Sequence, residues 1–268
     1  MYWKENLSLW QRLVRQPGFA LVTDVDGTIS PIVDQPDQAA VSPTIRPLLD
    51  DLCDLLPVVG VLSGRRVEDV RQRVGVPGLV YIGNHGLERF YQGNVVIPES
   101  VKPFIQKLAA AAEEIQPALL PGMMLEDKTA TLTIHYRQTH SEAEVLEKFT
   151  PFVKELAQRL GVDLFSGRKV YELRPPIGVD KGTAFAGLLQ DFNVQAAVYL
   201  GDDTTDAAAF KKAQALRAAG ECQAYSLGVE SANTPPEVLT YADYLVDGVG
   251  DVAAFFAMLL DSARASST

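Results

Sequence analysis

Short apolar runs alternate with longer amphipathic stretches along most of the chain. An apolar run that ends in turn residues is typical of a buried strand, whereas apolar positions three and four apart indicate a helix. Strands are predicted in this way at residues 19–23, 57–62, 79–82, 196–200, 222–226 and 244–246. Helices are predicted at residues 43–55, 67–74, 181–190, 205–219 and 249–260. Strands separated by helices point to an α/β fold with a parallel sheet.

The middle of the chain follows another pattern. Residues 88–97 carry Gly93-Asn94 between two apolar runs, which predicts a hairpin. The next stretch predicts an αββαββ unit, with helices at 101–115 and 141–160 and strands at 123–126, 130–136, 162–165 and 169–173. Its second helix has an apolar stripe that includes Val145, Leu146 and Phe149.

Pro175-Pro176 ends this unit, because proline breaks helices and central strands. We therefore expect a core of residues 1–98 and 175–268 with an inserted α/β domain of residues 99–174. The final residues, 261–268, are expected to be frayed.

Composition narrows the class of protein. A chain of 268 residues that is 47% hydrophobic can bury a full core. The formal net charge of −10 argues against a nucleic-acid partner, which calls for a basic face. Cys53 and Cys222 give neither a disulfide framework nor a metal-binding spacing. Without a signal-peptide pattern or an apolar run near about 18 residues, we expect a cytoplasmic monomer with no membrane partner.

An aspartate-rich motif follows the first predicted strand. In this motif Asp24 can attack phosphorus as a carboxylate, and Asp26 can act as acid and base on the other side of the bond. Gly27 permits a tight turn, and Thr28 can hydrogen-bond a phosphate oxygen. The alternative is an ordinary turn that the aspartates cap.

A second aspartate-rich motif, Gly201 to Asp206, follows the strand at 196–200. Its aspartates could simply cap the next helix, but capping rarely needs three carboxylates within five residues. Both motifs follow strands that would end at the same edge of a parallel sheet, so we expect them to converge there. Clustered carboxylates favour a hard divalent cation, and Mg²⁺ is expected, with Asp202 as a direct ligand and Asp203 and Asp206 in support.

Two further short segments fit an anionic substrate. Ser63-Gly64-Arg65 follows a predicted strand, where a hydroxyl group and loop amides can hold a phosphoryl oxygen; a plain helix cap is the alternative. Lys181 begins a predicted helix, where the helix dipole disfavours a cation. We therefore expect an anionic cluster beside Lys181.

In this order, the four segments resemble the motifs of the haloacid dehalogenase superfamily of phosphotransferases, over residues 19–246. The resemblance implies a Rossmann-like parallel-sheet core, an inserted αββαββ cap and phosphate ester hydrolysis through an aspartyl-phosphate. It also implies Mg²⁺ held by Asp24, the Asp26 backbone carbonyl and Asp202. The catalytic residues that it implies are Asp24, Asp26, Ser63 and Lys181.

A narrower resemblance is to the trehalose-6-phosphate phosphatases. It is carried by G-N-H-G at 83–86, E-D-K at 126–128, H-Y-R at 135–137, Y-E-L-R-P at 171–175, D-K-G at 180–182 and G-D-D-T-T-D with Phe210. It implies hydrolysis of trehalose 6-phosphate, with substrate bound by Thr28, Gly64, Arg65, Asn84, His85, Glu126, Lys128, Arg137 and Glu172. Ala207 departs from that family, in which a glutamate commonly follows the last aspartate.

Other interpretations stay open. Glu126 and Lys128 could form only an exposed ion pair, and His135 could be structural. The same chemistry could serve another sugar phosphate, such as sucrose phosphate or glucosyl-3-phosphoglycerate, or a sugar phosphomutase. A silent sugar-phosphate binding module and a structural subunit belong to other classes, but the intact set of Asp24, Asp26, Lys181 and Asp202 favours an enzyme.

Overall fold

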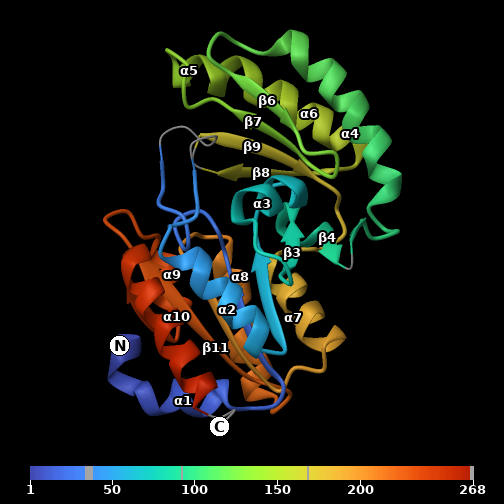
Figure 1. Cartoon of the computed structure of the whole chain (residues 1–268). Coiled ribbons are helices and arrows are strands. Elements are labelled where there is room, and N and C mark those ends of the chain that lie inside the picture. Colours follow the sequence, from blue (N-terminus) through green and yellow to red (C-terminus); the bar gives the residue numbers. More distant parts are fainter. Residues whose placement is uncertain (34–38, 92, 168, 266–268) are drawn as a thin grey trace. The chain divides into compact units, whose positions relative to one another are not determined.

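The computed structural model describes residues 1–33, 39–91, 93–167 and 169–265, and the chain divides into two compact units (Figure 1). The core unit joins Met1–Val95 and Val179–Thr268, and the insert unit is Val96–Gly178.

The core unit is built on an eight-stranded sheet in the order β12-β11-β10-β1-β2-β3-β4-β5. Its strands are β1 (Phe19–Thr23), β2 (Val58–Leu62), β3 (Val80–Gly83), β4 (Glu88–Tyr91), β5 (Asn94–Val96), β10 (Ala196–Gly201), β11 (Gln223–Glu230) and β12 (Tyr244–Asp247). Neighbours from β12 to β3 are parallel, and β4 runs antiparallel to β3. The central strands are buried throughout, because helices cover both faces, and this explains their continuous apolar runs.

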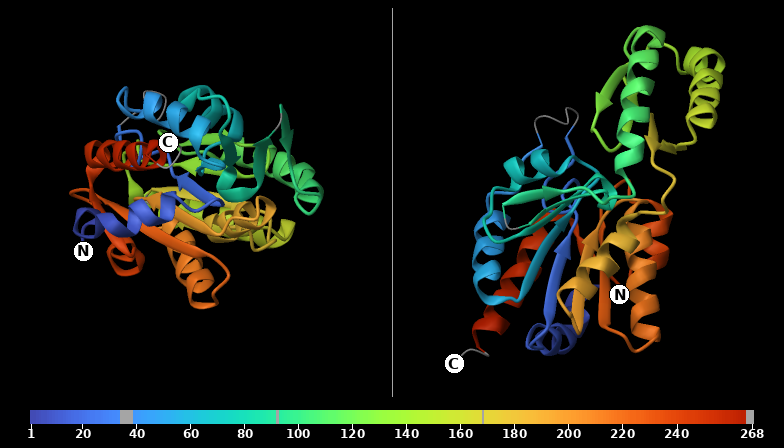
Figure 2. Two further views of the ribbon diagram at one scale, coloured as in Figure 1. Left: turned by 60° about the horizontal axis from the view of Figure 1, so that its bottom comes forward. Right: turned by 90° about the vertical axis from the view of Figure 1, so that its right-hand side faces the viewer.

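Helices pack on both faces of the core sheet (Figure 2, right). One face is covered by η1 (Trp3–Asn6), α1 (Leu7–Val14), α2 (Ile45–Leu55), α3 (Val67–Val74) and α10 (Gly248–Arg264). The other is covered by α7 (Lys181–Asp191), α8 (Asp206–Ala218) and α9 (Pro236–Tyr241). Trp10, Ile45 and Phe255 lie in the first hydrophobic core, and Phe185 and Phe210 lie in the second. The core is thus an α/β/α sandwich with a mostly parallel sheet, as the sequence predicts.

The insert unit has its own antiparallel sheet in the order β6-β7-β9-β8. Its elements are α4 (Lys102–Ile115), η4 (Gln116–Ala118), β6 (Met124–Asp127), β7 (Leu132–His135), α5 (Glu142–Glu144), the π-helix η5 (Val145–Phe149), α6 (Thr150–Leu160), β8 (Asp163–Gly167) and β9 (Val170–Arg174). Leu132 and Leu173 of the sheet share a core with Leu108 and Val153 of the helices. The other face carries Glu126, Thr133, His135, Glu172 and Arg174 beside the apolar side chains of Met124, Phe165 and Val170, and we call it the polar face.

The predicted helix at 141–160 is interrupted by the π-helix. Pro151 lacks an N–H and would clash with the carbonyl group of Glu147, so a regular α-helix cannot continue through this point. The wider turn rotates the apolar stripe, and Leu146, which we expected on the buried face, is 53% exposed. That part of the prediction was wrong.

Three further differences concern helices. The helices α1 and α9 were not predicted from the hydrophobic pattern. The chain was expected to fray from residue 261, but α10 continues to Arg264, because Ser262 and Ala263 are buried. Residues 266–268 lie outside the described part. Among the described residues, no helix combines the length and the apolar character needed to cross a membrane.

Candidate active site

The two aspartate-rich motifs meet at the carboxyl ends of β1 and β10. These strands are parallel neighbours with Thr23 opposite Leu200, and the Asp24 N–H donates to the Leu200 carbonyl at 2.9 Å. Oxygen atoms of Asp24, Asp202 and Asp206 therefore all lie within 4.8 Å of one another. The predicted convergence at one edge of the sheet is confirmed for these three side chains.

Lys181 lies inside this carboxylate cluster. Its Nζ atom is 2.9 Å from Asp24 Oδ1 and 2.7 Å from Asp206 Oδ1, and only 3% of the side chain is exposed. Burial alone would lower the pKa of Lys181, but Asp206 and Asp24 outweigh burial and raise it. Lys181 is thus a permanent cation, and the expectation of an anionic cluster beside it is confirmed.

Asp206 holds the loop that carries Asp202. Its Oδ1 accepts hydrogen bonds from Lys181 and from the Tyr199 hydroxyl at 2.6 Å, and its Oδ2 accepts the N–H groups of Asp202 and Asp203 at 3.1 and 3.0 Å. Because both oxygens are engaged, Asp206 orients the other carboxylates, and Asp24 and Asp202 have more capacity left for a ligand.

Asp24 and Asp202 repel each other in a largely buried site. Burial is the largest cause that raises the pKa of Asp24, to about 7. The charges of Asp206 and Asp26 also raise this pKa, and Lys181 lowers it. Burial first, and then the charges of Asp24 and Asp206, raise the pKa of Asp202 to about 9. Both carboxylates thus resist ionisation by themselves. A divalent cation would relieve this repulsion, so the donor set fits a metal ion.

The turn at Gly27 allows the two loops to approach each other closely. Gly27 has φ +85°, and a Cβ atom placed there would lie 2.0 Å from Asp202 Oδ2. Thr28, on the same turn, donates to Asp202 Oδ1 at 3.2 Å. Glycine is therefore required here both for its backbone conformation and for space.

The Asp26 side chain is directed to another partner. Arg65 Nε and Nη2 donate to its two oxygens at 2.6 and 2.9 Å, so the pair is doubly hydrogen-bonded. The Asp26 carboxylate is not one of the three clustered carboxylates found among the described residues. This is compatible with the expectation that only its backbone carbonyl would serve a metal ion.

The segment Ser63-Gly64-Arg65 and the loop Asn84-His85 form one structure. Asn84 N–H donates to the Arg65 carbonyl at 2.7 Å, and His85 N–H donates to the Ser63 carbonyl at 3.0 Å. A Cβ atom on Gly64 would lie 2.6 Å from His85 Cε1. Asn84 and His85 both adopt left-handed conformations, with φ of 47° and 58°. Such strained positions cluster at functional sites.

The candidate residues of the insert unit gather mainly on the polar face of its sheet. Glu126 and Glu172 flank Thr133 in one cross-strand row. His135 Nε2 lies 2.8 Å from Glu126 Oε2, Lys128 Nζ lies 4.0 Å from the same oxygen, and Arg174 donates to Glu172 at 2.5 Å. Lys128 is buried, which does not fit a purely exposed pair, whereas Arg137, just beyond β7, is exposed.

Three polar residues of the core were missed by the sequence analysis. Tyr199 lies within an apolar strand and Asp69 within a charged helix, so neither stands out from its neighbours. Glu88 is buried and accepts the Val67 N–H at the start of α3, at 3.0 Å. The signal that could have found Glu88 is a lone carboxylate at the first position of a predicted strand.

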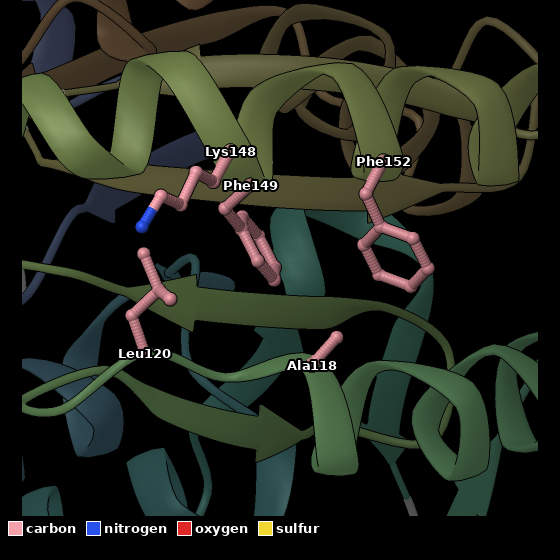
Figure 3. Close-up of a pocket in the computed structure, with 5 residues that line it drawn as sticks. All are labelled: Ala118, Leu120, Lys148, Phe149 and Phe152. Atoms are coloured by element: carbon pink, nitrogen blue, oxygen red, sulfur yellow. The ribbon is translucent and has the colours of Figure 1, made fainter.

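A hollow in the insert unit offers no comparable chemistry within the described chain (Figure 3). It is lined by Ala118, Leu120, Lys148, Phe149 and Phe152. The amine of Lys148 points away from the two phenyl rings and pairs with Glu144 at 2.6 Å. Because the described lining includes no carboxylate, the carboxylate cluster of the core is the stronger candidate for a reaction site.

Comparison with known proteins gives one family. A family profile described as trehalose-phosphatase matches residues 22–246. The trehalose-phosphate phosphatase of Mycobacterium marinum is 37% identical over 202 residues, which cover 72% of this chain and 51% of that protein. Trehalose-phosphate phosphatase B of Arabidopsis thaliana is 31% identical over 263 residues, which cover 90% of this chain and 66% of that protein. The chain thus spans about half the length of the mycobacterial relative.

Solved structures share the fold. A trehalose-6-phosphate phosphatase related protein superposes with a TM-score of 0.76 at 21% identity, covering 92% of this chain and 99% of that chain. The C-terminal domain of Candida albicans trehalose-6-phosphate phosphatase superposes with a TM-score of 0.74 at 21% identity, covering 96% and 97%. A haloacid dehalogenase-like hydrolase of Bacteroides thetaiotaomicron has a TM-score of 0.61 at 16% identity, over 89% of this chain and 98% of that chain.

Proposed function

Because the chain belongs to the trehalose-phosphatase family, we propose that it hydrolyses trehalose 6-phosphate to trehalose and phosphate. The observation that carries this proposal is the buried cluster of Asp24, Asp202 and Asp206 around Lys181. A purely structural role would not call for three carboxylates and one cation at a strand end, where sheets of this kind bind ligands.

Asp24 is the proposed nucleophile. Its carboxylate attacks phosphorus, the bond to the sugar oxygen breaks, and an aspartyl-phosphate forms. Lys181, 2.9 Å from Asp24 Oδ1, favours the ionised form that attack requires, although burial raises the pKa of Asp24 to about 7. The permanent charge of Lys181 also offsets negative charge that gathers on the phosphoryl group.

Asp26 is the proposed acid and base. It gives a proton to the departing sugar oxygen in the first step. In the second step it takes a proton from the water that attacks phosphorus, while the bond to Asp24 breaks and phosphate is released. Arg65 orients its carboxyl group through two hydrogen bonds. Ser63 and the amides of its loop are proposed to hold a phosphoryl oxygen, and Thr28 is proposed to hold another.

We propose that the metal ion is Mg²⁺, held by Asp24, the Asp26 carbonyl and Asp202, with Asp203 and Asp206 in support. When bound, Mg²⁺ would neutralise the carboxylate repulsion and the charge of the phosphate group. The residues fit this role because Asp24 and Asp202 are close together and resist ionisation alone.

We further propose that the polar sheet face of the insert unit recognises the sugar. Glu126 and Lys128 are the main candidates on this face, and Glu172 there and Arg137 just beyond β7 are proposed to assist. In the core unit, Asn84 and His85 are proposed separately as substrate-binding residues. Hydrogen bonds to hydroxyl groups discriminate strongly, because a wrong sugar leaves buried polar groups without partners.

The test is a substrate panel with Mg²⁺ in which phosphate release is measured from trehalose 6-phosphate, glucose 6-phosphate, sucrose 6-phosphate and glucosyl-3-phosphoglycerate. Trehalose 6-phosphate should be preferred, and Glu126→Gln should lower that preference more than it lowers the rate with glucose 6-phosphate. Preference for another ester would refute the substrate assignment but would keep the phosphatase chemistry. No release from any ester would refute both.

A further inference from the structure

An alternating chain of charged side chains extends from Asp26 into helix α3. Arg65 uses Nε and Nη2 on Asp26, and it uses Nη1 on Asp69 Oδ2 at 3.0 Å. Asp69 Oδ1 then accepts from Arg73 Nε at 2.7 Å. Arg73 Nη1 in turn donates to the backbone carbonyl of Ala39 at 2.8 Å. This series of ion pairs therefore connects the Asp26 carboxylate to the backbone carbonyl of Ala39.

This arrangement fixes the plane of the Arg65 guanidinium. A planar group that is bonded on three of its nitrogen atoms to two different carboxylates cannot rotate without breaking both pairs. The side chains of Arg65 and Arg73 are 17% and 15% exposed, against 39% and 36% for Asp26 and Asp69, so the guanidinium groups are the more buried partners of these pairs. Asp69 holds both arginines, one with each carboxylate oxygen.

The hydrogen bonds from Arg65 leave lone pairs on the Asp26 carboxyl group that can carry a proton. Each Asp26 oxygen accepts one N–H from Arg65, and a carboxyl oxygen has two lone pairs. The second lone pair stays available to carry the proton for the sugar oxygen. Arg65 thus sets the direction in which that proton points.

We propose that Asp69 is a positioning residue for the phosphatase reaction. It acts through Arg65 to hold the Asp26 carboxyl group at the orientation that protonates the departing oxygen. This inference rests on the proposed function and adds a residue that the sequence motifs do not contain. The plain alternative is that Asp69 only forms two helix-surface ion pairs of the i,i+4 type, which stabilise a helix slightly.

The test compares two leaving groups. A sugar alkoxide needs a proton as it departs, whereas p-nitrophenolate leaves without one. With the full chain and Mg²⁺, the rate constant of the first step is measured by rapid quench for trehalose 6-phosphate and by the p-nitrophenolate burst for p-nitrophenyl phosphate. Asp69→Asn should slow the first step at least about tenfold for trehalose 6-phosphate and less than about threefold for the aryl ester, because only the former depends on the acid.

Glu68→Gln is the matched control. Glu68 lies one residue away on α3 and pairs with Arg71 at 3.3 Å, so it is not part of the ion pairs that lead to Asp26. In Glu68→Gln both esters should therefore react at the wild-type rate. Arg73→Gln removes the hydrogen bond that supports Asp69. It should also slow the first step selectively for trehalose 6-phosphate, but by a smaller factor than Asp69→Asn. It also serves if Asp69→Asn fails to fold.

A double-mutant cycle gives a second readout. On an Asp26→Asn background, Asp69→Asn should cause no further loss with trehalose 6-phosphate, because its effect passes through Asp26. Equal slowing of both esters, an unchanged first step, or full additivity in the cycle would overturn the inference. If the wild-type protein prefers another alkyl phosphate, that ester replaces trehalose 6-phosphate and the test still stands. A wild-type protein that turns over no phosphomonoester refutes both proposals.

Discussion

Replacing Asp202 with asparagine should stabilise the metal-free protein, and the gain should grow with pH. In the folded chain burial, with Asp24 and Asp206 nearby, raises the pKa of Asp202 from 3.8 to about 9. Between these two values the native state keeps a proton that the unfolded state has lost. The free energy of unfolding therefore falls as pH rises, by about 1.4 kcal/mol per pH unit for one such proton.

The sign follows from linkage. A carboxyl group whose pKa is raised by folding adds no penalty below its unfolded pKa and adds its full penalty only above its folded pKa. The asparagine side chain would resemble the protonated form of Asp202 at every pH, and its oxygen can still accept the Thr28 hydrogen bond. From pH 5 to pH 7 the stability of Asp202→Asn relative to wild type should thus increase by about 2.7 kcal/mol at most, which corresponds to one proton over two pH units.

Urea unfolding at pH 5, 6 and 7 in metal-free buffer measures this difference. Asp203→Asn is the control: Asp203 is an exposed neighbour on the same loop whose charge is the smallest of the causes that raise the pKa of Asp202, so its replacement should change the pH profile far less. Added Mg²⁺ should reduce the gap, because a cation that binds the native state of the wild type stabilises it. A gap that stays constant from pH 5 to pH 7, or that shrinks, would refute the assigned repulsion.

Three further predictions test single parts of the site. Asp24→Asn should abolish phosphate release while the circular dichroism spectrum stays unchanged; measurable turnover would remove Asp24 as the nucleophile. Gly27→Ala should lower kcat by about 100-fold, because its Cβ would displace Asp202, and kinetics at several Mg²⁺ concentrations would show it; wild-type kinetics would contradict the close approach. Lys181→Met should lower the free energy of unfolding by about 3–5 kcal/mol, since Asp24 and Asp206 lose their buried partner; urea unfolding at neutral pH without metal measures it, and no loss would contradict the ion pairs.

Much of the fold could be predicted because the spacing of the apolar residues agrees with the strand or helix that forms and with the side of it that is buried. The apolar run at β1 and the amphipathic stretch at α3 gave strand and helix with the same bounds as in the structure. The π-helix before Pro151 could not be predicted from periodicity, because a stripe drawn at 3.6 residues per turn assumes a continuous α-helix. The end of α10 is helical because Ser262 and Ala263 are buried. Small residues give no hydrophobic pattern from which this burial could be predicted.

The candidate site likewise contains residues that could be predicted from the sequence and residues that could not. Asp24 and Asp202 stood out because their motifs place more carboxylates after two strands than capping usually needs, and Lys181 stood out because the dipole at a helix start disfavours a cation. Tyr199 and Asp69 did not stand out, because their significance depends on Asp206 and Arg65, which are close to them only in space. Sequence patterns thus indicated the groups expected to react, while the residues that orient these groups required tertiary structure.

The most direct test of the proposed reaction is to find where the phosphoryl group goes during turnover. Trehalose 6-phosphate labelled in its phosphate is mixed with the protein and Mg²⁺, the reaction is quenched in acid within one turnover, and the labelled peptide is identified. We predict label on Asp24, together with free trehalose, and no label on Asp24→Asn. Turnover with label on another residue or on none, or no turnover of trehalose 6-phosphate, would contradict this prediction.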